Sequence, residues 1–314
     1  QTNILEKINI NNFIFNSNPN ITQNGFYNNY DFIIKNVNTD TDNSKNYKKD
    51  ENYYLSGLFQ YNTSLPLKKE KNNNLHILKP KLALKLSPNF MKDLSKDDGK
   101  RLDVNNVFDI NRLAENDTLE GGASLTLGND FIITDQDKNF DVFGFKLANS
   151  VRFEENNDLP NNNQLGGKNS NFFGEILFRP NQIISTKYNA STKNNITEIN
   201  YENLTTEISI NNFVTTFDYL NENSSSDAKS YLTNTTRLSL NDSNSLQFST
   251  RENKSSNLTE YYNLMYEYKN DCLAASIEYN KDYYDDRDIK PEENIFLKLT
   301  IIPFGETSSP DLKK

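Results

Sequence analysis

The chain has 314 residues, of which 35% are hydrophobic and 25% charged, and its formal net charge is −9. The pI is near 4.9 and the mean hydropathy is −0.80. An acidic chain without a basic stripe is a poor ligand for nucleic acid, because phosphate binding requires clustered Lys and Arg. The polar average alone suggests a soluble or disordered chain. Disorder normally comes with few aromatic residues, however, and this chain has 17 Tyr and 20 Phe.

No run of 18 consecutive apolar residues occurs, which excludes a transmembrane helix but not a transmembrane barrel, whose strands show only alternation. The sequence begins QTNILEKINI, without a charged start or an apolar stretch. We therefore expect no signal peptide here and interpret the chain as a fragment of a longer protein.

Apolar and polar residues alternate with period two in segments of about ten residues, the length that a tilted strand needs to cross a bilayer. Helical periodicity is nearly absent, and we count about fifteen strand segments. The first three are the least certain: Ile4–Ile14, Tyr27–Val37 and Tyr53–Tyr61. The clearer ones are Leu75–Leu86, Leu119–Ile133, Phe140–Phe153, Phe172–Phe178, Gln182–Ser191, Ile196–Ile210, Phe213–Tyr219, Lys229–Leu240, Ser245–Arg251, Leu258–Tyr268, Leu273–Asp282 and Ile295–Phe304.

The alternation places an apolar row on one face of each strand. Leu82, Leu84 and Leu86 oppose Lys81, Ala83 and Lys85. Three later rows follow the same rule: Tyr262, Leu264, Tyr266 and Tyr268; Leu273, Ala275, Ile277 and Tyr279; Ile295, Leu297, Leu299 and Ile301. A soluble sandwich with its apolar face turned inward shows the same pattern, so alternation alone does not separate a sandwich from a barrel.

The connections between these segments alternate in length. Short turns occur at 135–139, 179–181, 211–212, 241–244 and 269–271, and longer loops at 87–117, 154–168, 221–227, 251–257 and 284–294. The tight turn near 193–195 is an exception on the long-loop side. Short turns on one rim and long loops on the other are typical of outer-membrane barrels, whose periplasmic turns are short. Tyr enrichment agrees, because amphipathic rings favour membrane interfaces.

We therefore predict an all-β, antiparallel outer-membrane β-barrel. About fifteen strands is an odd number, whereas bacterial single-chain barrels have even counts. The interpretation that we prefer is that these 14–16 strands are the C-terminal part of a larger barrel.

Two stretches carry a family resemblance. LSPNFMKDLSKDDGKRLDVNNVFDINRLAENDTLEGGASLTLGNDF, residues 86–131, resembles the LPS-assembly outer-membrane family LptD (OstA, organic solvent tolerance protein), notably in the blocks NVFDINRL and NDTLEGGASLTLG. The run EYYNLMYEYKNDCLAASIEYNKDYYDDRDIKPEENIFLKLTIIPFG is similar to that family's three terminal strands. Between them, SNFFGEILFRPNQIISTKYNAS is similar to its middle hairpins.

The resemblance implies a barrel of about 26 strands that inserts lipopolysaccharide (LPS) into the outer leaflet of the outer membrane of a Gram-negative bacterium. Residues 1–305 would be the C-terminal part of that barrel and residues 306–314 a tail, with a periplasmic jelly-roll and the first strands upstream. The implied partners are LPS, an LptE-like plug lipoprotein, an LptA-like periplasmic bridge that docks on the upstream domain, and the outer-membrane assembly machinery. A general porin or a TonB-dependent transport barrel is the alternative function.

Site residues follow from the same resemblance. Cys272, the only cysteine, matches one member of a cysteine pair that forms disulfides with the periplasmic domain, and Asp271 occupies the position of the other. The lateral exit for lipid would border the terminal strand with Ile295, Leu297, Leu299, Ile301 and Pro303. The lumen-facing basic candidates, for contacts with anionic headgroups or equally with the plug protein, are Lys81, Lys85, Lys146, Arg237 and Lys298.

We expect no catalysis, cofactor or metal. His76 is the only histidine, and we interpret it as a structural residue at a strand end. Asp97 with Asp98, and Asp285, Asp286 and Asp288, fall in long loops where solvated carboxylates are ordinary, although loop carboxylates could also help to bind divalent cations. Gly121, Gly122 and Gly128 precede no helix, which argues against a phosphate cradle and favours a bulge or a close backbone approach.

Overall fold

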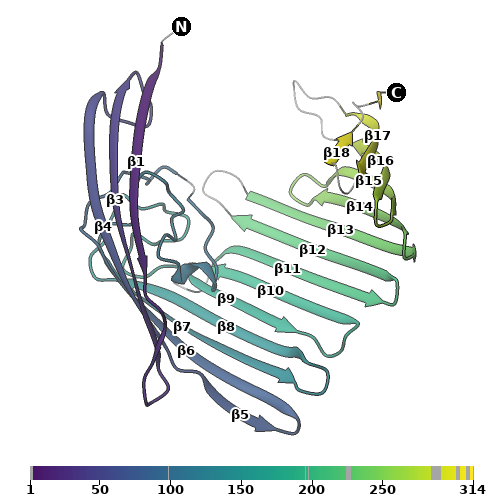
Figure 1. Cartoon of the computed structure of the whole chain (residues 1–314), viewed down its shortest axis with the longest axis horizontal. Coiled ribbons are helices and arrows are strands. Elements are labelled where there is room, and N and C mark those ends of the chain that lie inside the picture. Colours follow the sequence, from purple (N-terminus) through teal and green to yellow (C-terminus); the bar gives the residue numbers. More distant parts are fainter. Residues whose placement is uncertain are drawn as a thin grey trace. The chain divides into compact units, whose positions relative to one another are not determined.

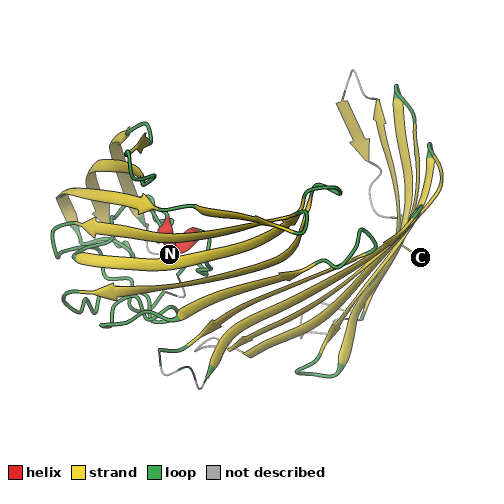
Figure 2. Cartoon of the chain, turned by 90° about the horizontal axis from the view of Figure 1, so that it is seen from below, coloured by secondary structure: helices red, strands yellow, loops and turns green. Residues whose placement is uncertain are grey.

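Period-two alternation builds an almost purely antiparallel β-structure in this computed structural model (Figure 1). The structure describes residues 3–97, 99–194, 196, 198–223, 228–283, 291–301, 305–308 and 312–313. In those residues, one short 3₁₀ turn, η1 (Asn106–Phe108), is the only helical element; Figure 2 shows it among the loops of the N-terminal part. No helix in the described ranges is long and apolar enough to span a membrane.

The described residues contain fifteen strands of seven residues or more, which agrees with the number of segments predicted from alternation. They are β1 (Leu5–Asn16), β3 (Tyr27–Asp42), β4 (Asp50–Ser64), β6 (Asn74–Leu86), β7 (Ala123–Asp135), β8 (Phe140–Arg152), β9 (Phe172–Phe178), β10 (Ile184–Thr192), β11 (Ile199–Ile210), β12 (Phe213–Asn223), β13 (Ala228–Asn241), β14 (Asn244–Asn253), β15 (Leu258–Lys269), β16 (Leu273–Asp282) and β17 (Glu293–Ile301). Four short strands, which alternation did not predict, are β2 (Asn20–Ile21), β5 (Leu67–Lys71), β18 (Gly305–Ser308) and β19 (Leu312–Lys313).

The chain folds into two compact units. The first unit comprises residues 1–175 and 190–200, and the second comprises residues 176–189 and 201–314. In the first unit each long strand pairs with the next one along the chain, from β1 with β3 to β7 with β8, and β5 forms a small hairpin with the start of β6. In the second unit the same order runs from β11 to β17.

The predicted start of one strand is wrong. The segment predicted from Leu119 begins as a strand only at Ala123, because Gly122 adopts a left-handed backbone (φ 90°) and the preceding residues turn away into a buried cluster. In the described residues the last long strand runs to Ile301, and β18 pairs with it antiparallel, with Gly305 opposite Ile301. Pro303 and Phe304 lie outside the described residues.

The two faces of the sheet are reversed relative to a soluble protein. In the first unit Ala83 and Lys85 are almost fully buried, whereas Leu86 on the opposite face is 43% exposed. The covering layer on the polar face consists of two long loops, residues 87–122 and 153–171, which contribute most of the main hydrophobic cluster: Leu94, Leu102, Val104, Val107, Leu113, Leu159 and Leu165. These loops pack on Ala148 and Phe173 of the strands.

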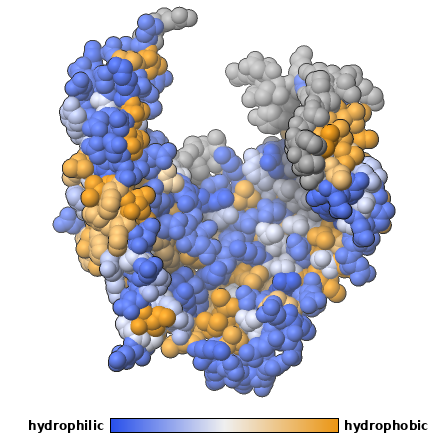
Figure 3. Space-filling model, viewed as in Figure 1, coloured by the Kyte–Doolittle hydropathy of each residue, from blue (hydrophilic) through white to orange (hydrophobic). Residues whose placement is uncertain are grey.

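The apolar rows of the second unit lie on one face and are open. Register places Tyr266 opposite Ile277 and Ile277 opposite Leu297, so the three rows predicted for β15, β16 and β17 share a face, because direct partners in an antiparallel ladder point to the same side. Ile277 is 52% and Leu297 46% exposed. In Figure 3 hydrophobic residues appear at the surface of the same segments. The apolar rows of the second unit are therefore exposed, whereas a soluble sandwich buries such rows between its sheets.

The apolar row on β16 predicts that an introduced charge destabilises the protein on the apolar face of the strand but not on the polar face. Ile277→Arg, in the middle of β16, should reduce the folded fraction of the full-length protein in detergent, because a cation on the lipid-facing side at mid-depth costs about 2–4 kcal/mol. Ser276→Arg, one residue away on the polar face and paired with Glu267, is the matched control. Heat-modifiable electrophoretic mobility measures the folded fraction. Equal loss in both variants would contradict the assignment of the faces.

Candidate functional site

A loop insert on the polar face of the first unit carries much of the buried packing of that unit. We define the insert as residues 87–122, between β6 and β7. It contains η1 and carries the two sequence blocks NVFDINRL and NDTLEGG. Its backbone leaves the sheet at Ser87, whose N–H donates to the carbonyl of Gly122, so the two ends of the insert are tied together.

Four buried charged side chains attach the insert to the strands. Glu120 of the insert accepts a bidentate pair from Arg112, with 2.7 Å from Nε to Oε2 and 2.6 Å from Nη2 to Oε1. Arg152 of β8 donates to the same Oε1 at 2.6 Å, and the Lys85 ammonium of β6 lies 3.6 Å from Oε2. We call Lys85, Arg112, Glu120 and Arg152 the anchor cluster. Each of its side chains is less than 5% exposed.

The three cations of the anchor cluster share one carboxylate, and neutral oxygen atoms accept their remaining hydrogen bonds. Arg112 also donates to the hydroxyls of Ser124, Thr126 and Ser150, each at 3.1 Å. Lys85 donates to the carbonyls of Asp109 and Ile110, at 2.5 and 3.1 Å. A buried charge is tolerated only when it is paired and its remaining hydrogen-bonding capacity is used, and the anchor cluster meets both conditions.

Arg152 extends the anchor to the second long loop. Its Nε donates to the carbonyl of Leu165 at 2.9 Å and its Nη1 to the carbonyl of Gly121 at 2.6 Å. A Cβ on Gly122 would lie 2.8 Å from that Nη1, and a Cβ on Gly128 would lie 2.7 Å from the Phe108 ring. These glycines therefore permit close approach, which confirms the expectation made for the EGGASLTLG block.

The charge of Glu120 is secured by its neighbours. Burial alone would raise the pKa of its carboxyl, but the charges of Arg112, Lys85 and Arg152 outweigh burial and hold the pKa well below its usual value. Glu120 stays ionised throughout the physiological range as a result, and the cluster carries an excess of positive charge.

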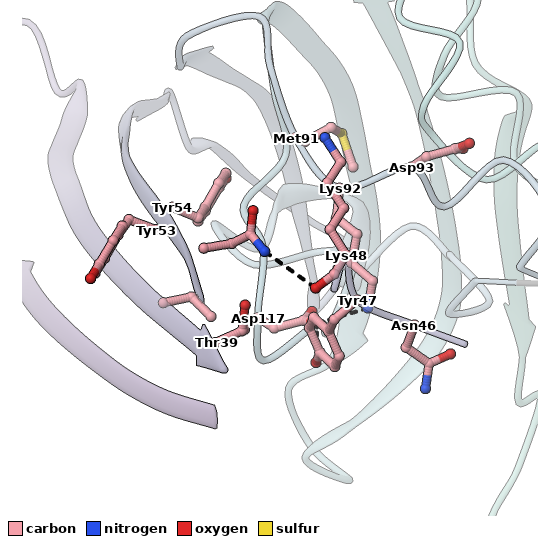
Figure 4. A pocket seen from close by; sticks show the side chains of 12 residues that line it. Thr39, Asn46, Tyr47, Lys48, Tyr53, Tyr54, Met91, Lys92, Asp93 and Asp117 are labelled. Carbon is pink, nitrogen blue, oxygen red and sulfur yellow. Dashed lines mark hydrogen bonds and ion pairs between the residues drawn. The ribbon is translucent and has the colours of Figure 1, made fainter. Parts of the chain in front are cut away.

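Two cavities flank the insert along β3 and β4. The long-loop cavity, of about 490 Å³, is lined by the β3–β4 loop and the insert, including Tyr47, Tyr54, Lys92 and Asp117 (Figure 4). Asp117 accepts from the Tyr47 hydroxyl at 2.6 Å and from Lys92 at 2.7 Å. Burial and Asp117 together raise the pKa of Tyr47, so this phenol is neutral and acts as a donor.

The short-turn cavity, of about 630 Å³, lies at the opposite end of the same strands. Its walls come from the turn before β3, the ends of β3 and β4, and the part of β6 near Lys81, and the insert contributes Phe108 and Ile110. An apolar cluster of Ile33, Leu58 and Leu119, with Ile110 packed against it, occupies the same strands. Ile33 lies between Asp31 of the short-turn cavity and Val37 of the long-loop cavity on β3, so apolar side chains separate two polar spaces.

The basic residues predicted to face the lumen all lie on polar faces. Lys81 pairs with Asp130 at 2.8 Å and Lys146 with Glu175 at 2.8 Å. Arg237 of β13 lies 3.2 Å from Glu267, and Lys298 of β17 is exposed opposite Ser276. Lys85 differs from these four because the insert covers it, and its ammonium holds the insert instead of facing open space.

The other predicted site residues fall in the second unit. Cys272 is an exposed free thiol in the short turn between β15 and β16, where its N–H donates to the Asn270 side chain at 3.0 Å. Ile295, Leu297, Leu299 and Ile301 are 39–46% exposed on β17. The other edge of β17 is partly paired, with β18 opposite Lys298–Ile301 and β19 opposite Asn294 and Ile295.

The structure offers little support for other chemistry in its described ranges. The His76 ring lies 6.2 Å from that of Phe131, its partner in an aromatic pair. No group of three or more His, Cys, Asp or Glu side chains is arranged to hold a metal ion in the part of the chain that was searched. Asp98, Asp285, Asp286 and Asp288 lie outside the described residues.

Sequence reasoning recognised the blocks that contain Arg112 and Glu120 but assigned no role to either residue, and it missed Arg152. The available signal was an Arg in an apolar context, INRLA, followed eight residues later by a Glu beside two glycines. Alternation does not report on loop residues, and it places Arg152 on a polar face without indicating burial.

The anchor cluster, the insert and the strands that hold them fall within one family match. A model of the family LptD, LPS transport system D, matches residues 34–251. The chain belongs to the LptD family. No curated protein matches the chain.

Membership of the LptD family identifies the fold and the general function of the chain. This is an antiparallel outer-membrane β-barrel chain of the system that transports and assembles LPS at the outer membrane, and the match favours neither a general porin nor a TonB-dependent barrel. The alternating rows therefore divide lipid from an aqueous interior, and the insert of this LptD chain lies on the interior side.

Glu120→Gln tests whether the anchor cluster holds the insert. Three buried cations would lose their carboxylate, and breaking such a group by removing one partner costs about 3–5 kcal/mol. We expect protease cleavage near the exposed Arg101 to become several times faster than in the parent protein, while the barrel itself stays folded. Glu154→Gln, in the exposed start of the second loop, is the control. An insert that resists protease equally in both variants would show that the cluster does not hold it.

The lowered pKa of Glu120 gives this protection a defined pH dependence. A carboxyl whose pKa falls on folding contributes stability that is present above its unfolded pKa, 4.5, and is lost as the pH falls through the lower folded value. The difference in protease resistance between the parent protein and Glu120→Gln should therefore persist at pH 4.5 and shrink only in stronger acid. Loss of the difference already between about pH 6 and pH 5, above the usual carboxyl pKa of roughly 4, would contradict the assignment.

Proposed function

We propose that residues 1–305 form the C-terminal part of an LptD barrel, that residues 306–314 are a tail, and that a periplasmic jelly-roll and the first strands belong upstream in the same protein. The observation that carries this proposal is the combination of the family match with the arrangement of the faces. Apolar rows such as that of Ile277 and Leu297 are open, whereas the charged anchor cluster is buried on the polar side.

The proposed work is physical transport without covalent chemistry. The sugar headgroup of LPS crosses along the polar interior while its acyl chains pass into the bilayer through an opened seam between strands. We place this lateral exit beside the last long strand, at Ile295, Leu297, Leu299 and Ile301, and include Pro303, which the structure does not describe. The short pairing of β18 and β19 along β17 supports the choice, because short edge pairings separate at low cost.

Basic side chains on the polar face are proposed to guide the anionic headgroup. Lys81, Lys146, Arg237 and Lys298 are the candidates, because ammonium and guanidinium groups form strong charge-assisted bonds with phosphate. Lys85 contributes indirectly, by holding the insert that shapes the space.

The proposed partners are LPS, an LptE-like plug lipoprotein, an LptA-like periplasmic bridge that docks on the upstream domain, and the outer-membrane assembly machinery. The proposed location is the outer membrane of a Gram-negative cell. The family match supports an LPS pathway in general.

Depletion and complementation test the proposed function. Cells depleted of the full-length protein should lose newly made LPS from their surface, measured with an antibody that does not cross the outer membrane. Re-expression of the full-length protein should restore the signal. Normal arrival of LPS at the surface of depleted cells would overturn the proposal.

Cys272 gives a second test, directed at the proposed link to the periplasmic domain. The exposed thiol lies in a short turn, and a thiol in an oxidising compartment pairs readily. Because the sequence holds one cysteine, any partner belongs to another segment or another protein. We expect the full-length protein from cells to migrate faster without reductant than with it, and Cys272→Ser to abolish that difference. The same mobility with and without reductant in the unchanged protein would count against the disulfide.

A further inference from the structure

We propose that the outward face of the β5–β6 hairpin binds anionic phospholipid headgroups in the membrane leaflet at the short-turn rim. We call this surface the rim patch and define it as Leu67, Lys69, Lys71, Asn74, His76 and Leu78. The proposal goes beyond the transport of LPS. It rests on the proposed location in the outer membrane, where the short-turn rim meets a phospholipid leaflet.

The hairpin extends past its neighbour β3 on the short-turn side. Ser64 of β4 pairs with Lys81 and Leu67 of β5 pairs with Leu78, so the register along β6 is the same for both strands. On its other side, β4 pairs with β3 only as far as Tyr27, which lies opposite Ser64. β5 therefore lies at the tip of the hairpin, at the far end of β6 from the insert (Figure 1).

Register places the rim patch on the same face as the lipid-facing rows. Leu78 and His76 lie on the same face of β6 as Leu84, because even numbers of residues separate them from it. Their direct partners across the hairpin, Leu67 and Lys69, point to that face as well. The patch is therefore continuous with the surface that meets hydrocarbon.

The rim patch begins where the apolar row on β6 ends. From Leu86 to Leu78 this row covers about 27 Å along the strand and roughly 21 Å along the membrane normal at a tilt of about 40°. Because the apolar band of such barrels is about 25 Å tall, the next residue on this face, His76, lies at the interface with water. The Phe131 ring lies 6.2 Å from the rings of both His76 and Phe143, and aromatic girdles mark this interface.

Charge differs between the two faces of β5. On the inward face Lys68 and Glu70 neutralise each other, with 3.0 Å from Nζ to Oε1. On the outward face Lys69 and Lys71 are exposed and form no ion pair within the described ranges. Lysines on an edge strand also discourage pairing with other strands, but that role does not require them on one face.

Asp135 is an acidic neighbour of the patch, and its carboxylate is already engaged. It lies opposite Asn74 in the ladder of β6 and β7. Its Oδ2 pairs with Lys138 at 3.4 Å, and its Oδ1 accepts from the backbone N–H groups of Asp137 and Lys138. The two outward lysines of β5 therefore present uncompensated positive charge at a membrane surface, and clustered lysines in that position attract anionic lipids.

Native mass spectrometry of the full-length protein in detergent tests the proposal. The probe is dioleoyl phosphatidylglycerol, compared with dioleoyl phosphatidylcholine, which has the same chains and no net charge. We expect phosphatidylglycerol to bind more tightly and Lys69→Gln to weaken its binding about fivefold, the factor that one lysine contributes at an anionic surface. Lys68→Gln, one residue away on the opposite face, removes the same charge and should leave the affinity nearly unchanged. Lys69→Arg should retain the affinity.

A second measurement needs no substitution. In vesicles that contain phosphatidylglycerol, Lys69 and Lys71 should react more slowly with an acetylating reagent than in vesicles of phosphatidylcholine alone. Lys68 of the same molecule is the internal reference, and its rate should be the same in both kinds of vesicle.

Separate outcomes decide between the possibilities. Equal effects of Lys69→Gln and Lys68→Gln, equal binding of the two lipids, or equal acetylation in both kinds of vesicle overturns the rim patch as a lipid site. Heat-modifiable mobility identifies a variant that fails to fold, and the acetylation of the unchanged protein then stands as the test. Arrival of LPS at the cell surface is scored separately: normal delivery by a protein that shows no preference for phosphatidylglycerol removes the rim patch but leaves the proposed function intact.

Discussion

One buried carboxylate determines how the interior of the first unit is organised. Glu120 holds Arg112 within the insert, Arg152 on β8 and Lys85 on β6, so a single side chain connects a loop of 36 residues to two strands. Hydrophobic contacts of the insert with Ala148 and Phe173 bury apolar surface but do not fix the orientation of the insert. The bidentate bond between Glu120 and Arg112 does fix an orientation, because two parallel bonds set both the distance and the angle between their partners.

Position on the polar face makes this cluster necessary. A soluble domain buries its apolar rows and lets loops fray in water, but here the apolar rows face outward and contribute nothing to holding a loop inside. An interior loop must then be held by polar bonds or by a small core of its own. The insert uses both, and the charged bonds lie where the loop meets the sheet, at Gly121 and Gly122.

Strand positions and faces were largely predictable from the sequence, because period two is a property of neighbouring residues. β9 and β16 match their predicted ranges, and the rows around Leu84 and Ile277 lie on the predicted faces. Strand ends were less predictable where a distant contact decides them. The start of β7 depends on Glu120 meeting Arg152, which is 32 residues away, and no local pattern carries that information. The polar ends of β3 and β4 pair with each other, and the end of β3 also pairs with β1, so these ends are strands through partners that no local pattern reveals.

The candidate site also has features that the sequence predicts and features that only distant contacts decide. Alternation placed Lys81 and Lys85 together on a polar face, and their chemistry is alike in the sequence. The structure separates their roles, because Lys85 ends under carbonyls of the insert and Lys81 ends at the wall of a cavity beside Asp130. The difference of four residues along β6 decides whether a lysine holds the interior together or borders space that a transported headgroup can enter. Residue type alone therefore identifies the polar face of such a barrel, and only the packing of its loops identifies the part of that face that remains open.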